Sequence, residues 1–265
     1  IIAWMISQRF WPYLARKTSW LGGFLKGKSM TPVTSRMRQT MEDQDGSKSA
    51  ELAANLRGAR YEIAFQCLRG YRPGGWHPEI TVEGREHIDT VLQSGKGCVV
   101  WVAHFVFSPN IAKVGLGTLG YSVAHLSRPD HGLSSTRFGI RCLNPVRSKF
   151  EDSYLSERIR FDRAHPAAAL LRARKIVAGN GIVSFTAGAW EGSSLVEADF
   201  LGHRARLAMG PVWLARKSGA KLLPVFALRT KAPDSFVVHV GNPIDVHAAP
   251  TEAESMEAAA TDFLQ

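Results

Sequence analysis

One stretch of the sequence decides the fold: VEGREHIDTVLQSGKGCVVWVAH, residues 82–104. Its apolar residues Ile88, Val91 and Leu92 recur at the i, i+3, i+4 spacing of one face of a short helix. The run Cys98–Ala103 is continuously apolar, which is typical of a strand that is covered on both faces, as in a parallel sheet. A helix followed by a buried strand predicts an α/β fold.

His104 comes directly after this predicted strand. Before the strand, Ser94–Gly97 contains two glycines, which tolerate the left-handed conformation at a helix C-terminus. Beyond the histidine, Ser108 and Pro109 are typical of an N-cap followed by proline at the first helical position. Ligands of open α/β sheets bind at the carboxyl ends of the strands, so His104 is a candidate functional residue; the alternative is a hydrogen-bonded structural histidine.

The rest of the sequence alternates between helical and strand patterns. A polar linker is predicted at 41–50, an arginine-rich polar stretch at 128–163, helices at about 50–69, 109–118, 167–178, 211–218 and 251–264, and strands at 122–126, 181–185, 221–228 and 236–240. We therefore predict one α/β domain over 71–265, with a mostly parallel central sheet flanked by helices, preceded by an N-terminal helical segment over 1–70.

The composition is that of a globular, basic protein. The 265 residues are 45% hydrophobic, and no run of about 18 apolar residues is present that would span a bilayer. Lys and Arg number 33 against 23 Asp and Glu, a net charge of +10, which favours polyanionic partners such as anionic lipid, acidic carrier proteins or nucleic acid. The three separated cysteines, Cys67, Cys98 and Cys142, indicate a reducing compartment without disulfides or a zinc site.

The N-terminal segment is both basic and aromatic. Residues 1–40 contain seven Lys or Arg and no acidic residue. The aromatic residues interleaved with these charges are Trp4, Phe10, Trp11, Tyr13, Trp20 and Phe24. This mixture predicts a segment that lies at a membrane interface; a basic helix packed on the domain and a nucleic-acid contact are the alternatives. The chain begins at Ile1, so a longer hydrophobic anchor could precede it, and no cleavable signal peptide is recognisable.

Several blocks of the second half, in their order, resemble a known family. The blocks are VEADFLG (196–202), a Gly-Pro that opens a helix, and LARKSGAKLLPVFALR (214–229). They resemble the bacterial lipid A late acyltransferases and the phosphatidylinositol mannoside acyltransferases, which belong to the lysophospholipid acyltransferase superfamily. Residues 82–105 resemble the segment that leads into the family's His-x4-acid motif, and GYSVAHLSRP (120–129) fits as well, so that the resemblance covers about residues 80–245.

The resemblance implies an O-acyltransferase. Such an enzyme moves a fatty acyl chain from an acyl thioester, acyl-ACP or acyl-CoA, to a hydroxyl of a glycolipid or lysophospholipid at the cytoplasmic face of the bacterial inner membrane. The transfer needs a general base and donors for the developing oxyanion, but no metal, no further cofactor and no nucleophilic side chain. In agreement, the sequence contains no G-x-S-x-G elbow, Walker loop or H-E-x-x-H helix.

The family's motif makes His104 the general base, but the motif acid is missing. The family has Asp or Glu five residues after the histidine, where this chain has Pro109. Ser108 and Asn110 are the neighbouring polar residues, which we expect to contact substrate, and Asn110 is also a candidate to fix the imidazole tautomer. A rival interpretation follows: a pseudoenzyme of the same fold that binds lipid or acyl carrier without turnover. Nucleic-acid binding is the weaker rival, and the oligomeric state is left open.

The missing negative charge is predicted to come from Glu197, in VEADFLG, or from Glu191, in AWEG. Some relatives are thought to pair the histidine with a remote glutamate, which favours Glu197. The alternative for both residues is an ordinary solvated loop carboxylate.

Four arginines are candidate contacts for phosphate. Arg137 and Arg141 fall in RFGIR, where the family resembles a segment that places an arginine near the active site. Arg204 and Arg206 precede the helix predicted at 211–218, whose N-terminus would also favour an anion. The alternative for each is a solvated surface arginine.

Overall fold

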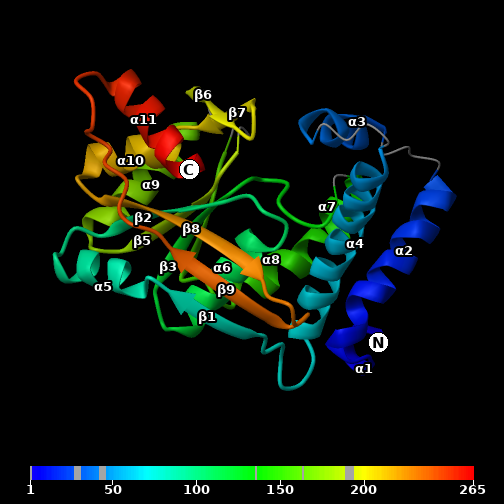
Figure 1. Ribbon diagram of the computed structural model, residues 1–265. Helices are drawn as coiled ribbons and strands as arrows, with labels where there is room; N and C mark the ends of the chain where they lie inside the picture. The colour runs from blue at the N-terminus through cyan, green and yellow to red at the C-terminus, as the bar shows by residue number, and fades with distance from the viewer. Residues whose placement is uncertain (1, 27–30, 42–45, 135, 163, 189–193) are drawn as a thin grey trace. The chain divides into compact units, whose positions relative to one another are not determined.

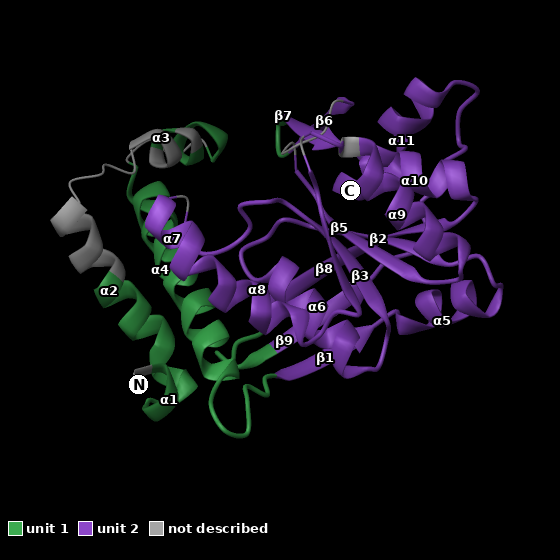
Figure 2. Cartoon of the chain, turned by 180° about the vertical axis from the view of Figure 1, so that it is seen from behind, with its two compact units in different colours: residues 1–78, 201–203, 229–235 green, residues 79–200, 204–228, 236–265 purple. Residues whose placement is uncertain are grey.

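The computed structural model describes the chain apart from residues 1, 27–30, 42–45, 135, 163 and 189–193 (Figure 1). The chain forms two compact units, which Figure 2 shows in different colours. Unit 1 contains residues 1–78, 201–203 and 229–235, and unit 2 contains residues 79–200, 204–228 and 236–265.

Unit 1 is helical and is built around the long helix α4 (Ser47–Gly70), which extends the predicted helix slightly at both ends. Its other helices are α1 (Ile2–Met5), the 3-10 helix η1 (Gln8–Phe10), α2 (Trp11–Lys26) and α3 (Thr31–Thr40). Trp11 is fully buried. Its ring contacts the Phe65 ring edge-on, with the centroids 6.2 Å apart, and the Arg69 guanidinium carbon lies 5.6 Å from the centroid of the Trp11 ring. Large aromatic rings therefore hold α2 against α4.

Unit 2 has the predicted α/β architecture with a mostly parallel sheet. The described strands of this sheet, in spatial order, are β1 (Glu79–Glu83), β9 (Ser235–Val240), β8 (Lys221–Arg229), β2 (Cys98–Val102), β5 (Ile182–Thr186), β3 (Val123–Ser127) and β4 (Glu157–Arg160). The five strands from β8 to β4 run parallel, and β2 pairs with β8 on one side and β5 on the other. The strand that the sequence singles out is thus buried near the middle of the sheet, where its continuous apolar run is required.

Helices flank this sheet on both faces. Their bounds are α5 (Arg85–Gln93), α6 (Ser108–Thr118), α7 (Arg137–Cys142), α8 (Asn144–Asp152), α9 (Pro166–Ala178), α10 (Gly210–Ser218) and α11 (Glu252–Leu264). Val99 and Trp101 of β2 belong to the hydrophobic core formed with α9, α10 and α11. Cβ atoms alternate along a strand, so the remaining β2 side chains point to the opposite face, where α6 and α8 contact one another (Figure 1).

Some elements differ from those predicted. The arginine-rich stretch 128–163 contains α7, α8 and β4, and β1 is a further strand that the sequence pattern did not reveal. Residues 195–208 form a two-stranded sheet of β6 (Leu195–Phe200) and β7 (His203–Ala208). The N-cap of α6 is Phe107, so the predicted N-cap, Ser108, is the first helical residue. None of the described helices combines the length and the apolarity that crossing a bilayer requires.

Candidate functional site

His104 lies just beyond the carboxyl end of β2. The adjacent main chain is held on both sides: the Ala103 N–H donates to the Val225 carbonyl of β8, and the Ala187 N–H donates to the Val102 carbonyl of β2. The pairing therefore continues past the end of the strand, and His104 is the first exposed residue after it. This is the edge of a parallel sheet at which ligands bind in open α/β folds.

The residues that follow His104 form an apolar surface beside it. Phe105 and Val106 are exposed, although both are large and hydrophobic. The ring centroids of Phe105 and Phe226 of β8 are 6.1 Å apart, and Phe226 stacks on Phe263 of α11 with a centroid distance of 5.7 Å. Phe263 in turn stacks on Trp101 of β2 at 4.0 Å. A row of aromatic rings thus runs from the core to the surface at Phe105, the residue that follows His104.

The start of α6 points its polar side chains inward. Ser108 is fully buried, and its hydroxyl accepts a hydrogen bond of 3.0 Å from the Ala227 N–H of β8. Pro109 and Asn110 are buried as well. The Ser108 hydroxyl therefore ties α6 to the sheet, and the predicted substrate contacts at Ser108 and Asn110 lie inside the protein.

Three of the predicted site residues come together on the β6–β7 hairpin, which packs against α11. The Glu197 carboxylate of β6 lies 3.9 Å from Arg204 and 3.6 Å from Arg206, and Arg204 also donates to the Glu197 carbonyl at 3.1 Å. All three side chains are about half exposed, so these ion pairs are weak in solvent. Glu191 lies outside the described residues.

The remaining predicted arginines, Arg137 and Arg141, lie on α7 and are both exposed. They are one helical turn apart and therefore share a face of the helix.

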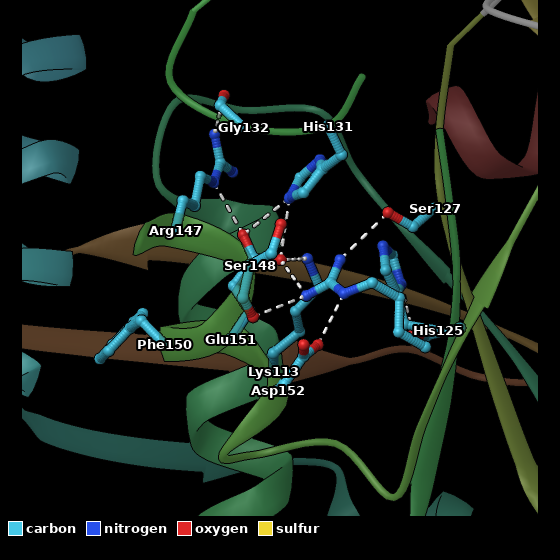
Figure 3. A network of polar contacts seen from close by, with 12 residues as sticks. Lys113, His125, Ser127, His131, Gly132, Arg147, Ser148, Phe150, Glu151 and Asp152 are labelled. Atoms are coloured by element: carbon cyan, nitrogen blue, oxygen red, sulfur yellow. Dashed lines mark hydrogen bonds and ion pairs between the residues drawn. The ribbon is translucent and has the colours of Figure 1, made fainter. Parts of the chain in front are cut away.

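The sequence did not reveal the most highly charged cluster of unit 2, which surrounds Glu151 of α8 (Figure 3). Glu151 has no solvent exposure, yet its carboxylate accepts hydrogen bonds from four basic side chains. These are Lys113 at 2.8 Å, His131 at 2.9 Å, Arg147 at 2.7 Å and Arg158 at 3.0 Å. Arg158 also contacts Asp152 at 2.6 Å and Ser127 at 3.0 Å.

The cluster has strongly perturbed protonation equilibria. Burial by itself raises the pKa of Glu151, but the charges of Lys113, Arg147 and His131 outweigh burial and hold that pKa well below its ordinary value. Burial lowers the pKa of Lys113 to about 8, although Glu151 opposes the shift. Burial also lowers the pKa of His125, whose imidazole lies 2.8 Å from the Ser184 hydroxyl in the neighbouring strand. We regard the network as a rigid support for the sheet edge, because its groups are almost entirely buried and hydrogen-bonded to one another.

One part of this network has a sequence signal. Arg147 and Glu151 are spaced i, i+4 on α8, as an intrahelical ion pair requires. Lys113, His131 and Arg158 come from other elements, and only the folded sheet brings them together. Within the parts of the chain that the structure describes, no group of three or more His, Cys, Asp or Glu is placed to hold a metal ion.

Comparisons with known proteins do not assign a function to this chain. No protein-family model matches the chain, and no curated protein matches it significantly. Among solved structures it is similar to the 1-acyl-sn-glycerophosphate (LPA) acyltransferase PlsC from Thermotoga maritima, with a TM-score of 0.40 and 13% sequence identity over 97% of this chain and 96% of that chain. A similarity of this size does not by itself assign an activity.

Proposed function

We propose that the chain is an O-acyltransferase that moves a fatty acyl chain from acyl-ACP or acyl-CoA to a hydroxyl of a glycolipid or lysophospholipid. The observation that carries the proposal is the position of His104: an exposed histidine just beyond a central parallel strand, beside the exposed apolar residues Phe105 and Val106. A general base must reach solvent or substrate, and an acyl chain needs apolar surface next to the reacting carbonyl.

In this mechanism the imidazole of His104 removes the proton of the acceptor hydroxyl as that oxygen attacks the thioester carbonyl. The tetrahedral intermediate then collapses and the carbon–sulfur bond breaks, so that the carrier leaves as a thiolate. The imidazolium of His104 donates its proton to this thiolate. Glu197 or Glu191 is the proposed charge partner of His104, and Arg137 or Arg141 a contact for phosphate or for the oxyanion. Arg204 and Arg206 are further phosphate contacts, and their present partner Glu197 is exposed enough to exchange.

We propose that the enzyme acts at a membrane surface, the cytoplasmic face of a bacterial inner membrane. Trp4, Phe10 and Tyr13 of unit 1 are exposed, and Arg9 and Lys17 lie over the rings of Phe10 and Tyr13. Exposed rings with neighbouring cations suit the headgroup layer of an anionic bilayer and support the interfacial interpretation. The side chains of Trp20 and Phe24 lie outside the described residues.

A second candidate is supported by one observation. Pro109 is buried at the start of α6, where the resembling family has its motif acid. A chain without that acid could bind acyl carriers or lipids and not turn them over.

The test is acyl transfer by the purified chain. The protein is incubated with acyl-ACP or acyl-CoA and a panel of hydroxyl-bearing lipids, and products are identified by mass spectrometry. The lipids of cells with and without the gene are compared in parallel. A product heavier by one acyl chain supports the enzyme and names the acceptor. If no acceptor is acylated and the two lipid profiles are identical, the enzyme is excluded and the binding protein is favoured.

A further inference from the structure

The most unusual surface of unit 2 is α7 with the residue that follows it. Every residue from 137 to 143 is exposed except Gly139. Phe138 is 71% exposed, and Ile140 and Leu143 are exposed as well. Together with Arg137 and Arg141, these residues are called the α7 surface below. A soluble domain normally buries a phenylalanine, so an exposed group of three large apolar side chains indicates an interaction site.

The geometry of the helix arranges these residues in order. Successive residues are about 100° apart around an α-helix, so the buried Gly139 lies opposite the midpoint between Arg137 and Arg141. Phe138 and Ile140 then lie on the two sides of the arginine pair. The exposed face of α7 is therefore a cationic ridge with an apolar side chain on each flank.

The segment is held in this position by buried contacts. Asn144 is 4% exposed, and its side-chain oxygen accepts hydrogen bonds of 2.9 Å from the Leu133 and Ser134 N–H groups. Its side-chain nitrogen donates to the Asp130 and Ser134 carbonyls at 2.9 and 3.0 Å. A Cβ atom at Gly132 would lie 2.1 Å from the Asn144 side chain, so this close contact requires glycine.

A second connection links the segment before α7 to the Glu151 cluster. Arg147 donates to the Gly132 carbonyl at 3.3 Å and to Glu151 at 2.7 Å, and Figure 3 shows its side chain between Gly132 and the carboxylate. The Thr136 hydroxyl accepts from the Gly139 N–H as the N-cap of α7. These hydrogen bonds fix the main chain that carries the exposed apolar side chains of the α7 surface.

The charge of the segment selects its partner. Residues 131–150 contain no Asp or Glu, whereas Arg137, Arg141 and Lys149 are exposed cations. Cations beside apolar side chains fit the surface of an anionic bilayer, where arginines meet phosphates and apolar side chains enter the boundary of the acyl chains. A second copy of the chain would bring the same cations face to face in a symmetric contact, which is unfavourable.

We infer that the α7 surface is a membrane-docking site of unit 2, and that its ligand is the headgroup layer of a bilayer rich in anionic phospholipid. The inference goes beyond the proposed function, because docking requires no turnover and uses a part of the chain other than the basic, aromatic N-terminus. Arg137 and Arg141, which the proposed function offers as contacts for a substrate phosphate or the oxyanion, contact headgroup phosphates in this role instead, and Phe138, Ile140 and Leu143 enter the interface.

The chain offers its own reporter for the test. Cys142, at the end of α7, is exposed, whereas Cys67 and Cys98 are buried and burial raises the pKa of Cys98 to about 12. An environment-sensitive fluorophore therefore reacts with the full chain at Cys142. The labelled protein is mixed with vesicles of phosphatidylcholine alone or with 30% phosphatidylglycerol (roughly the anionic content that gives a strong surface potential). A second label at Leu171→Cys, on the exposed face of α9 in a Cys142→Ser chain, is the positional control.

We expect the emission at Cys142 to shift to the blue and to rise with anionic vesicles only, and to fall again with salt. The label at position 171 should not respond. In the double variant Arg137→Gln/Arg141→Gln, the lipid concentration that gives half of the emission change at Cys142 should rise about 30-fold. This corresponds to a loss of roughly five-fold in affinity per cation. Its matched control, Arg174→Gln/Lys175→Gln on α9, removes the same charge from another exposed face and should have little effect.

Three outcomes would overturn the inference. The first is an unchanged Cys142 emission while the chain sediments with anionic vesicles, since another part of the chain then makes the contact. The second is an emission at Cys142 that is already blue without lipid, which would show that the protein itself or a second copy covers α7. The third is an equal loss of binding in the α9 double variant, which would reduce the effect to net charge.

Discussion

Lys113 and Glu151 form an ion pair inside the protein, with Nζ 2.8 Å from Oε2 and side-chain exposures of 4% and 0%. Lys113 lies on α6, the helix that follows His104, and Glu151 lies on α8. The pair therefore links the helix beside the candidate base to the helix that follows the α7 surface. A buried carboxylate with four basic partners makes this link sensitive to the loss of a single charge.

Replacing Glu151 by Gln should destabilise the fold strongly. The substitution leaves Lys113, Arg147 and Arg158 without their shared counter-charge, and breaking a buried pair costs about 3–5 kcal/mol. The free energy of unfolding is measured by urea denaturation. The control is Glu157→Gln, which breaks the exposed pair with Arg172 and should cost about 1 kcal/mol or less. Equal losses in both variants would show that the cluster does not stabilise the protein.

Stability should fall as the pH is lowered below about 6.5. Burial holds the pKa values of His125 and His131 below their ordinary 6.5, so the unfolded chain takes up protons that the folded chain does not. Each histidine then contributes a slope of at most about 1.4 kcal/mol per pH unit until its folded pKa is reached. The lowered pKa of Glu151 continues the loss in more acidic solution, below 4.5.

The pH dependence is measured by urea denaturation between pH 5 and pH 8 (roughly the range around the histidine pKa). In His131→Gln the slope just below pH 6.5 should decrease, because one of the two histidines no longer titrates. An identical slope in the variant would contradict the role of His131.

Replacing His104 by Ala should lower the acyl-transfer rate by about 10²–10⁴-fold, because the reaction loses its general base. The control is His165→Ala, whose side chain is 78% exposed and pairs with Asp162. Both variants should keep the melting temperature of the natural chain. An undiminished rate in the His104 variant would exclude this residue as the base.

Substituting Pro109 tests the missing motif acid, with Glu and Gln variants compared directly. Both place a polar side chain at a buried position of α6 and should lower stability by about 1–3 kcal/mol. Only Glu adds a charge, so the ratio of their acyl-transfer rates isolates that charge. We expect the Glu variant to be faster than the Gln variant if His104 lacks a carboxylate partner in the natural chain. Equal rates would support Glu197 or Glu191 as the partner already in use.

Replacing Asn144 by Ala should loosen the segment that supports α7. Amide hydrogen exchange at Leu133 and Ser134 should become faster, because both N–H groups lose their acceptor. Asn180→Ala is the matched control: Asn180 also bonds main-chain groups of two segments, at Gly97 and Leu92. It should leave exchange at Leu133 and Ser134 unchanged. Unaltered exchange in the Asn144 variant would contradict the support that we assign to it.

The fold was largely predictable because its signals are local. The apolar run of β2, the glycines at 95 and 97 with positive φ, and the alternating helices and strands all follow from short windows of sequence. β1 and β4 lacked such a signal: β1 alternates with partly polar residues, and β4 is the four-residue run ERIR, which local sequence does not distinguish from a charged loop.

The candidate site was less predictable, because it depends on which side chains point outward. The inward direction of Ser108 and Asn110 is decided by the packing of α6 on the sheet, and the position of Glu197 by its hairpin with Arg204. The Glu151 cluster joins residues from α6, β4, α8 and the loop before α7. No local pattern contains a contact of that range.

The parallel sheet also determines the order in which the protein can fold during synthesis. Cys98 of β2 pairs with Lys221 of β8, nearly half the chain later, whereas its other neighbour, β5, is made earlier. Until β8 leaves the ribosome, one edge of β2 therefore lacks its neighbour, and this strand carries Val99, Val100 and Trp101. An apolar strand with one unpaired edge is prone to aggregate or to bind a chaperone. The yield of soluble protein should therefore depend on how fast the last third of the chain is translated.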